Sequence, residues 1–201
     1  MSAGALARRA LLAVLVHAVL VLAWPLVRPV YAPAYRTLGQ EALGVISPWP
    51  APLRVRLVPG TSSELATDQV GADTTARLEH RELKGAGAFG VSTFFHGWHP
   101  TSVLLALFLA ATPLDWRARR RPLLWALLWL HLFLLARLVV AVTYTCALTS
   151  IEGRPLIALS PAGLRALRMA WHFVWGEVLT NYLGALVVWS LCVFDRRSRV
   201  A

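Results

Sequence analysis

The residues best suited to chemistry in this sequence are a cysteine and the basic side chains that follow it. Cys146 ends one long apolar run, and three basic residues begin the next run on one helical stripe, at i, i+3 and i+7: Arg165, Arg168 and His172. A thiol held beside such groups can ionise to the thiolate, which attacks carbonyl carbon. In this interpretation Cys146 is a nucleophile, Arg168 stabilises the thiolate or an oxyanion, and His172 is a general base or acid. Alternatively, Cys146 is a small buried hydrophobic residue and the arginines lie at a membrane interface.

A second set of polar residues lies inside the apolar runs, where ionisable groups are costly and need a partner. Arg137 lies in the span predicted at 123–148, and Glu177 lies in the span predicted at 166–194. Each residue is the same number of positions from the outer end of its span. Because consecutive spans run antiparallel, we predict an ion pair between the two at equal depth, with Asn181 one turn beyond Glu177 adding a hydrogen bond. The pair would lock two helices together. A proton or substrate pathway, or a contact to another subunit, stays open.

Three histidines, His17, His131 and His172, also lie within predicted spans, and neutral imidazole can ligate a haem or chlorophyll-type tetrapyrrole. Their expected depths differ, since His17 is central, His131 lies toward the inside and His172 toward the outside. One shared metal needs ligands at one depth, so we predict no metal site and no cofactor. A tetrapyrrole on a single histidine, or a quinone, remains the alternative.

Motifs of established chemistry are missing elsewhere in the sequence. It contains no phosphate-binding glycine motif, no zinc-ligand spacing and no Gly-x-Ser-x-Gly elbow. The two cysteines, Cys146 and Cys192, fall at opposite ends of their spans and cannot pair. Because no complete catalytic constellation can be named, we expect a protein without enzymatic activity, and the Cys146 enzyme is the alternative.

The composition is that of a protein whose solvent is largely lipid. Hydrophobic residues make up 57% of the 201 residues, charged residues only 15%, and the mean hydropathy is +0.58. The net charge of +10 would suggest a nucleic-acid partner in a soluble protein. Here the basic residues cluster at the ends of apolar runs, where membrane proteins place their anchors, so we expect membrane lipids and no nucleic acid.

Four apolar runs predict transmembrane helices, at residues 10–27, 98–116, 123–148 and 166–194. The first could also be a signal peptide, but the position of Pro33 after the candidate cleavage site favours a retained span. The second reaches full length only with Trp98 and Trp116, which we expect at its two interfaces. Aromatic residues expected as an interfacial belt follow the first run: Trp24, Tyr31 and Tyr35.

Arginine clusters predict the orientation of these spans. The clusters lie before the first span, between the second and third, and after the fourth: Arg8 and Arg9; Arg117, Arg119, Arg120 and Arg121; Arg196, Arg197 and Arg199. All three fall on one side, so the positive-inside rule predicts that both termini are cytoplasmic. Heavy use of alanine, leucine and arginine is typical of a GC-rich bacterial gene. We therefore expect a multipass protein of the bacterial inner membrane, with residues 28–96 and 149–165 in the periplasm.

The segment between the first two spans is expected to form a small exported sheet. Period-two alternation predicts strands at 53–58, 75–80 and 91–95, with turns at 59–60 and 84–87. The expected fold is an all-α membrane protein, a four-helix bundle with a β-containing insertion. Its parts are residues 1–35 (first span), 36–97 (exported insertion) and 98–201 (remaining spans). So small a sheet needs help from the helices or from a partner, and serves as a cap or as a docking surface.

The stretch His96-Gly-Trp-His-Pro-Thr-Ser-Val-Leu-Leu-Ala-Leu-Phe-Leu-Ala-Ala-Thr-Pro-Leu-Asp-Trp, followed by the middle arginine cluster and a leucine-rich span, resembles small membrane proteins associated with bacterial exosortase systems. Exosortases themselves are multipass enzymes that act through a cysteine near the outer face with basic partners, to which Cys146, Arg165, Arg168 and His172 are loosely similar. The resemblance implies membership of such a membrane system.

These observations support three functions. The first is a noncatalytic membrane accessory or scaffold subunit that docks to a larger membrane or periplasmic assembly of other subunits. The second is an exosortase-like membrane cysteine transpeptidase or protease that uses Cys146. The third is a tetrapyrrole- or quinone-binding subunit of a respiratory or photosynthetic complex.

Overall fold

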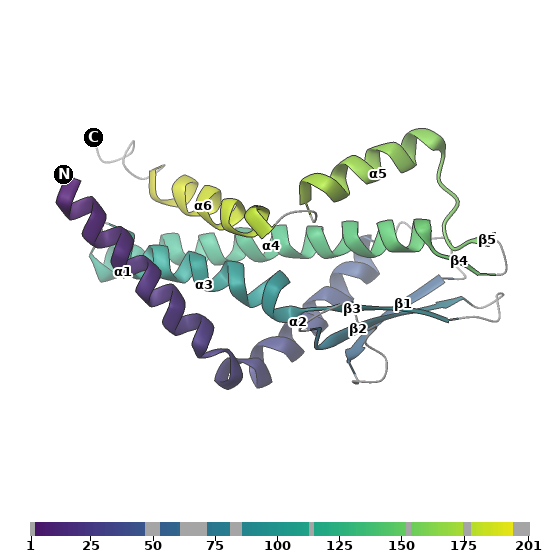
Figure 1. The fold of residues 1–201 in the computed structure, drawn as a ribbon, viewed down its shortest axis with the longest axis horizontal. Helices are drawn as coiled ribbons and strands as arrows, with labels where there is room; N and C mark the ends of the chain where they lie inside the picture. The colour runs from purple at the N-terminus through teal and green to yellow at the C-terminus, as the bar shows by residue number, and fades with distance from the viewer. Residues whose placement is uncertain are drawn as a thin grey trace.

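The computed structural model describes residues 3–46, 53–60, 72–80, 86–112, 115–151, 154–174 and 178–194. It consists mainly of helices, with one small three-stranded sheet at one end (Figure 1). The elements, of which η1 and η2 are π-helical, are α1 (Ala3–Leu22), α2 (Trp24–Ile46), β1 (Leu53–Pro59), β2 (Thr74–His80), β3 (Ala86–Val91), η1 (Phe94–Trp98), α3 (His99–Ala106), η2 (Leu107–Ala111), α4 (Trp116–Leu148), β4 (Ser150–Ile151), β5 (Arg154–Pro155), α5 (Pro161–Val174) and α6 (Val178–Phe194).

Three helical segments within the described residues are long and apolar enough to cross a membrane: Gly4–Leu22, Phe94–Ala111 and Trp116–Leu148. They correspond to the first three predicted spans. Large apolar side chains on these helices are exposed, as expected of surfaces that contact lipid; on α1 they include Leu11, Val14, Leu15 and Val19, and on α4 Leu124, Trp125, Leu128 and Trp129. The prediction of an apolar, mainly helical fold is confirmed.

The fourth predicted span, residues 166–194, is divided in the structure. Its residues belong to two helices, α5 and α6, and residues 175–177 between them lie outside the described part of the chain. α5 is strongly amphipathic, since it exposes Arg165 and Arg168 and packs its other side on α4. Such a helix suits a surface rather than the interior of a bilayer. The count of four spans is therefore not confirmed.

The first predicted span also has different bounds. α1 ends at Leu22, and after a turn at Ala23 the chain continues as α2 through Pro29 and Pro33 to Ile46. Proline removes a backbone donor from a helix, which is why the sequence pattern did not predict α2. Packing on α4 and β1 stabilises it nevertheless. Tyr35, predicted as part of an interfacial belt, is only 4% exposed and belongs to a hydrophobic core.

The second predicted span begins and ends earlier than expected. η1, α3 and η2 form one helical run from Phe94 to Ala111, and Trp116 begins α4 instead of ending this run. Trp98 is buried and donates its indole N–H to the carbonyl of Leu20 at 3.0 Å. The prediction that Trp116 ends this span is therefore wrong, whereas an interfacial depth of the two tryptophans stays a prediction. The run ends because Thr112, which precedes a proline, is extended (φ −72°, ψ 123°).

The sheet is antiparallel with the order β1-β2-β3. Its strands alternate, so that Val55 and the opposite Leu78 face inward while Arg56 and the opposite Arg77 face outward. Strands predicted at 53–58 and 75–80 are confirmed. The strand predicted at 91–95 is wrong, because β3 occupies 86–91 and the apolar residues after it begin the helical run at Phe94. The alternation continues past the end of β3 into a helix, and a period-two pattern does not reveal where the strand ends.

Two hydrophobic cores share the long helix α4. The sheet core joins β1–β3 and α2 to the second half of α4 and includes Tyr35, Leu43, Val55, Leu78, Leu138, Val142 and Cys146. The helix core joins α3 and α6 to the first half of α4 and includes Leu104, Phe108, Ala126, Leu130, Leu134 and Ala185. With 33 residues, α4 is about 50 Å long, whereas the hydrocarbon core of a bilayer is about 30 Å thick. α4 is therefore longer than one bilayer crossing requires, and its second half packs in the sheet core (Figure 1).

Candidate functional site

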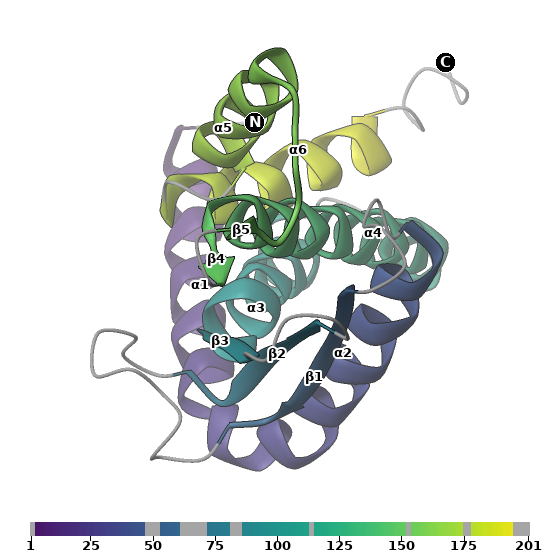
Figure 2. The ribbon, with the colours of Figure 1, turned by 90° about the vertical axis from the view of Figure 1, so that its right-hand side faces the viewer.

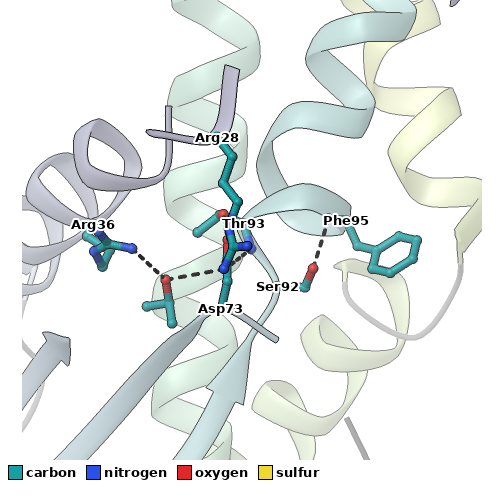
Figure 3. Close-up of polar contacts among 7 residues, drawn as sticks. Arg28, Arg36, Asp73, Ser92, Thr93 and Phe95 are labelled. Atoms are coloured by element: carbon teal, nitrogen blue, oxygen red, sulfur yellow. Dashed lines mark hydrogen bonds and ion pairs between the residues drawn. The ribbon is translucent and has the colours of Figure 1, made fainter. Parts of the chain in front are cut away.

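A polar junction built on Asp73 connects the sheet to the helices. Asp73 precedes β2 and is 9% exposed. Its Oδ1 accepts a hydrogen bond from the backbone N–H of Thr93 at 2.9 Å, and its Oδ2 accepts one from the Thr93 hydroxyl at 2.5 Å (Figure 3). Thr93 directly precedes η1, so this one carboxylate holds the point where the chain passes from the sheet into the helical run.

Two arginines of α2 approach the same junction. The Nε of Arg28 lies 3.7 Å from Oδ2 of Asp73, and Arg36 donates to the Thr74 hydroxyl at 3.4 Å. The Arg28 side chain is 56% exposed, so water screens this ion pair, which contributes at most about 1 kcal/mol. The hydrogen bonds satisfy a buried carboxylate that would otherwise be costly. The junction therefore ties α2, β2 and η1 together, and its role is structural.

Two of the predicted histidines take part in hydrogen bonds between helices. His17 on α1 places Nδ1 3.1 Å from the Ser102 hydroxyl, which donates to the carbonyl of His99 at 2.7 Å. The hydroxyl has one proton, so Nδ1 of His17 is the donor in its contact. His131 has Nδ1 2.8 Å from the carbonyl of Leu127 and Nε2 3.3 Å from the Tyr31 hydroxyl. Both nitrogens of His131 are thus engaged, and a tetrapyrrole iron could bind it only by replacing one of these contacts.

Cys146 and the basic stripe lie in different surroundings. The thiol has no exposed surface and belongs to the sheet core, with Val142 and Leu156. By contrast, the three predicted basic partners are exposed on α5: Arg165, Arg168 and His172. The structure places the stripe toward solvent and the thiol inside, which does not favour a nucleophile for an external peptide.

Arg137 lies on α4 between the two cores, next to Leu138 of the sheet core. It is only 2% exposed, and its guanidinium carbon lies 5.8 Å from the ring centroid of Phe133. Glu177 lies outside the described residues, and Asn181 is described only as a position of α6. α6 packs along α4, as the predicted ion pair requires. The pair of Arg137 with Glu177 stays a prediction.

A groove of about 320 Å³ opens beside β3. In Figure 2, β3 lies on the side of the sheet away from α2. Aromatic and apolar side chains from β3, α4 and α5 line it, with two threonines: Phe89, Gly90, Ala141, Tyr144, Thr145, Leu148, Thr149 and Trp171. The rings of Tyr144 and Trp171 stack with centroids 4.7 Å apart. A concave surface of this kind suits recognition of an apolar group.

The sequence did not single out the lining of this groove. Trp171 lies one residue before the predicted base His172, and Tyr144 lies two before Cys146, but aromatic residues near the ends of apolar runs are usually interfacial anchors. Only the packing of α5 on α4 joins the two rings. No family model, curated protein or solved structure matches the chain.

Proposed function

We propose that the protein is a noncatalytic membrane accessory subunit that holds a small sheet outside the bilayer and docks it to a larger membrane or periplasmic assembly. The observation that carries this proposal is the continuity of α4, which runs from the helix core into the sheet core. One unbroken helix gives the sheet a fixed height and orientation relative to the apolar helices. A subunit that positions a partner needs such a rigid support.

The groove supports binding rather than chemistry. Among the residues that the structure describes, its lining contains tyrosine and threonine hydroxyls but no carboxylate, histidine or cysteine. Nucleophilic catalysis requires a reactive group that touches the substrate and a base within hydrogen-bond reach. Cys146, the candidate nucleophile, is enclosed by the sheet core. These surroundings favour an accessory role over a membrane peptidase.

The proposed placement follows the arginine clusters. Both termini and the arginines at the start of α4 would lie in the cytoplasm of a bacterial cell, and the sheet in the periplasm. A fourth crossing would be made by α6 together with the end of α5. The resemblance of residues 96–116 to exosortase-associated proteins makes a membrane peptidase system of that kind the proposed assembly.

Native electrophoresis of the full chain, extracted in mild detergent, tests the function. We expect the protein to migrate with a second protein at fixed stoichiometry and to be colourless. Migration as this chain alone would contradict an accessory role, and a visible absorption spectrum would favour the cofactor-binding subunit. Reporter fusions at Thr75 check the placement, since a cytosolic Thr75 would overturn it.

A further inference from the structure

We propose that the groove receives an extended segment of a partner membrane protein, which pairs with β3 as a fourth strand and inserts one apolar side chain between β3 and the Tyr144–Trp171 stack. This inference rests on the proposed function and specifies the partner. It follows from three features of the described residues: the open edge of β3, the groove beside it and the charges around the groove.

The two edges of the sheet differ. At the β1 edge, Gln40 of α2 covers the outward backbone groups: its amide N–H donates to the carbonyl of Val55 at 3.0 Å, and its Oε1 accepts from the N–H of Leu57 at 2.9 Å. β3 pairs with β2 on one side, and no described residue makes comparable bonds to its other side. Alternate residues of such a strand direct N–H and C=O outward, where they bind extended backbone.

The side chains of β3 leave this backbone accessible. Its sequence is Ala-Gly-Ala-Phe-Gly-Val, with Ala88 exposed at its centre. Proteins commonly protect exposed edges with lysine, proline or an inward charge, and β3 has none of these. The side chains of β3 therefore would not hinder an added strand from pairing with this edge beside the groove.

The groove determines which side chain the added strand needs. Phe89 and Gly90 of β3 form one wall, and Tyr144 and Trp171 form the other. A strand paired with β3 directs alternate side chains toward α4 and α5. The space of about 320 Å³ equals the liquid volume of roughly ten water molecules, which a leucine or an aromatic side chain would partly displace.

Charge and direction specify the rest of the segment. Arg168 lies one turn before Trp171, which lines the groove, and Arg168 is exposed. It favours a carboxylate near the inserted apolar residue. The strands run alongside α4 (Figure 1), so an added strand would run in the direction in which α4 crosses the bilayer. The occupant is therefore an acidic, extended segment adjoining a transmembrane helix of the partner.

Photo-cross-linking of the full chain in native membranes tests this inference. A photoreactive phenylalanine analogue replaces Ala88 on β3 or, as the matched control, Arg54, which is exposed on β1. We expect position 88 to cross-link to a juxtamembrane segment of one other membrane protein, identified by mass spectrometry. Adducts of position 88 with lipid, with a second copy of this chain or with its own residues would overturn the proposal.

Variants of the groove test whether the same site is used. Trp171→Ala should lower the yield from position 88 by about tenfold, as truncation of a central aromatic residue does at interfaces. Met169→Ala, on an exposed position of the same helix, should leave it unchanged. Thr145→Phe fills the groove without removing a side chain from the stack and should have the effect of Trp171→Ala. An unchanged yield in Thr145→Phe contradicts the proposal even where Trp171→Ala misfolds.

The two proposals fail differently. If position 54 cross-links to the partner and position 88 does not, the accessory function stands and pairing at β3 is wrong. If neither position cross-links to any other protein, both the docking function and this inference are wrong.

Discussion

Thr93 donates two hydrogen bonds to the carboxylate of Asp73, one from its backbone N–H at 2.9 Å and one from its hydroxyl at 2.5 Å. The first residue leads into the helical run that begins at Phe94, and the second leads into β2. Through this contact a buried side chain ties the sheet to a candidate span. The predictions below begin with its stability.

Replacing Asp73 with asparagine should destabilise the protein by about 1–3 kcal/mol, because one of the two acceptor oxygens becomes an NH₂ group that cannot accept a bond from Thr93. Thermal unfolding in detergent measures the loss. Glu79→Gln, which changes an exposed carboxylate on β2, the strand that follows Asp73, should stay within about 0.5 kcal/mol of wild type. Equal effects of the two substitutions would show that the junction contributes nothing specific.

Two glycines of α2 should respond in opposite ways to alanine. A Cβ at Gly39 would lie 2.7 Å from Cδ2 of Leu138 and 2.8 Å from Cδ1 of Leu57, so both leucines must move and we expect a loss of roughly 1–3 kcal/mol. A Cβ at Gly44 would meet no atom within 4 Å, so Gly44→Ala should stabilise the helix by up to about 1 kcal/mol. Chemical denaturation of both variants checks the sign, and a stabilising Gly39→Ala would contradict the close packing of α2 on α4.

Tyrosine titration should show two phenols that ionise late. Burial raises the pKa of Tyr31 to about 12, and burial, followed by the nearby Tyr31, raises the pKa of Tyr35 further above its usual range. The fold favours the neutral phenols, so their contribution to stability is complete below about pH 10 and is lost as the pH rises through the folded pKa. Phenolate absorbance of the wild type, compared with Tyr31→Phe and Tyr35→Phe, measures this late phase. A single phase near pH 10 in folded protein would disprove it.

Cys146 should be inert toward thiol reagents in the folded protein, since its side chain is 0% exposed. In a Cys192→Ala background, maleimide should label Cys146 slowly until denaturant is added. Cys146→Ala should retain function in a complementation assay, because an accessory subunit needs no nucleophile. Loss of function in a variant that still inserts and folds would restore the enzyme interpretation.

Arg137 and Glu177 should be energetically coupled. A double-mutant cycle with Arg137→Ala and Glu177→Ala is expected to give an interaction energy of about 1–3 kcal/mol, because removing Glu177 would leave the buried charge of Arg137 without this partner. The exposed Arg120, cycled against Glu177, serves as the control pair and should be additive. Additivity of Arg137 and Glu177 would disprove the predicted ion pair.

Much of the fold could be predicted because its signals are local. The alternation at Leu53–Val58 indicates a strand with one exposed face. The apolar run at Leu123–Leu148 indicates a lipid-facing helix. α2 was not predicted, since Pro29 and Pro33 argue against a helix and only contacts with α4 and β1 outweigh them. The groove was not predicted either, because no spacing rule joins Phe89 to Trp171.

The sequence by itself determined the long apolar helices α1 and α4 and the alternating strands β1 and β2, because hydropathy and periodicity are properties of neighbouring residues. Only the tertiary structure decided that Cys146 is enclosed while Arg168 is exposed, and that Gln40 covers the β1 edge while no described residue covers the β3 edge. These outcomes depend on which elements pack together. Packing is set by shape and burial across the whole chain, so the spacing of residues along the sequence does not reveal which elements pack together.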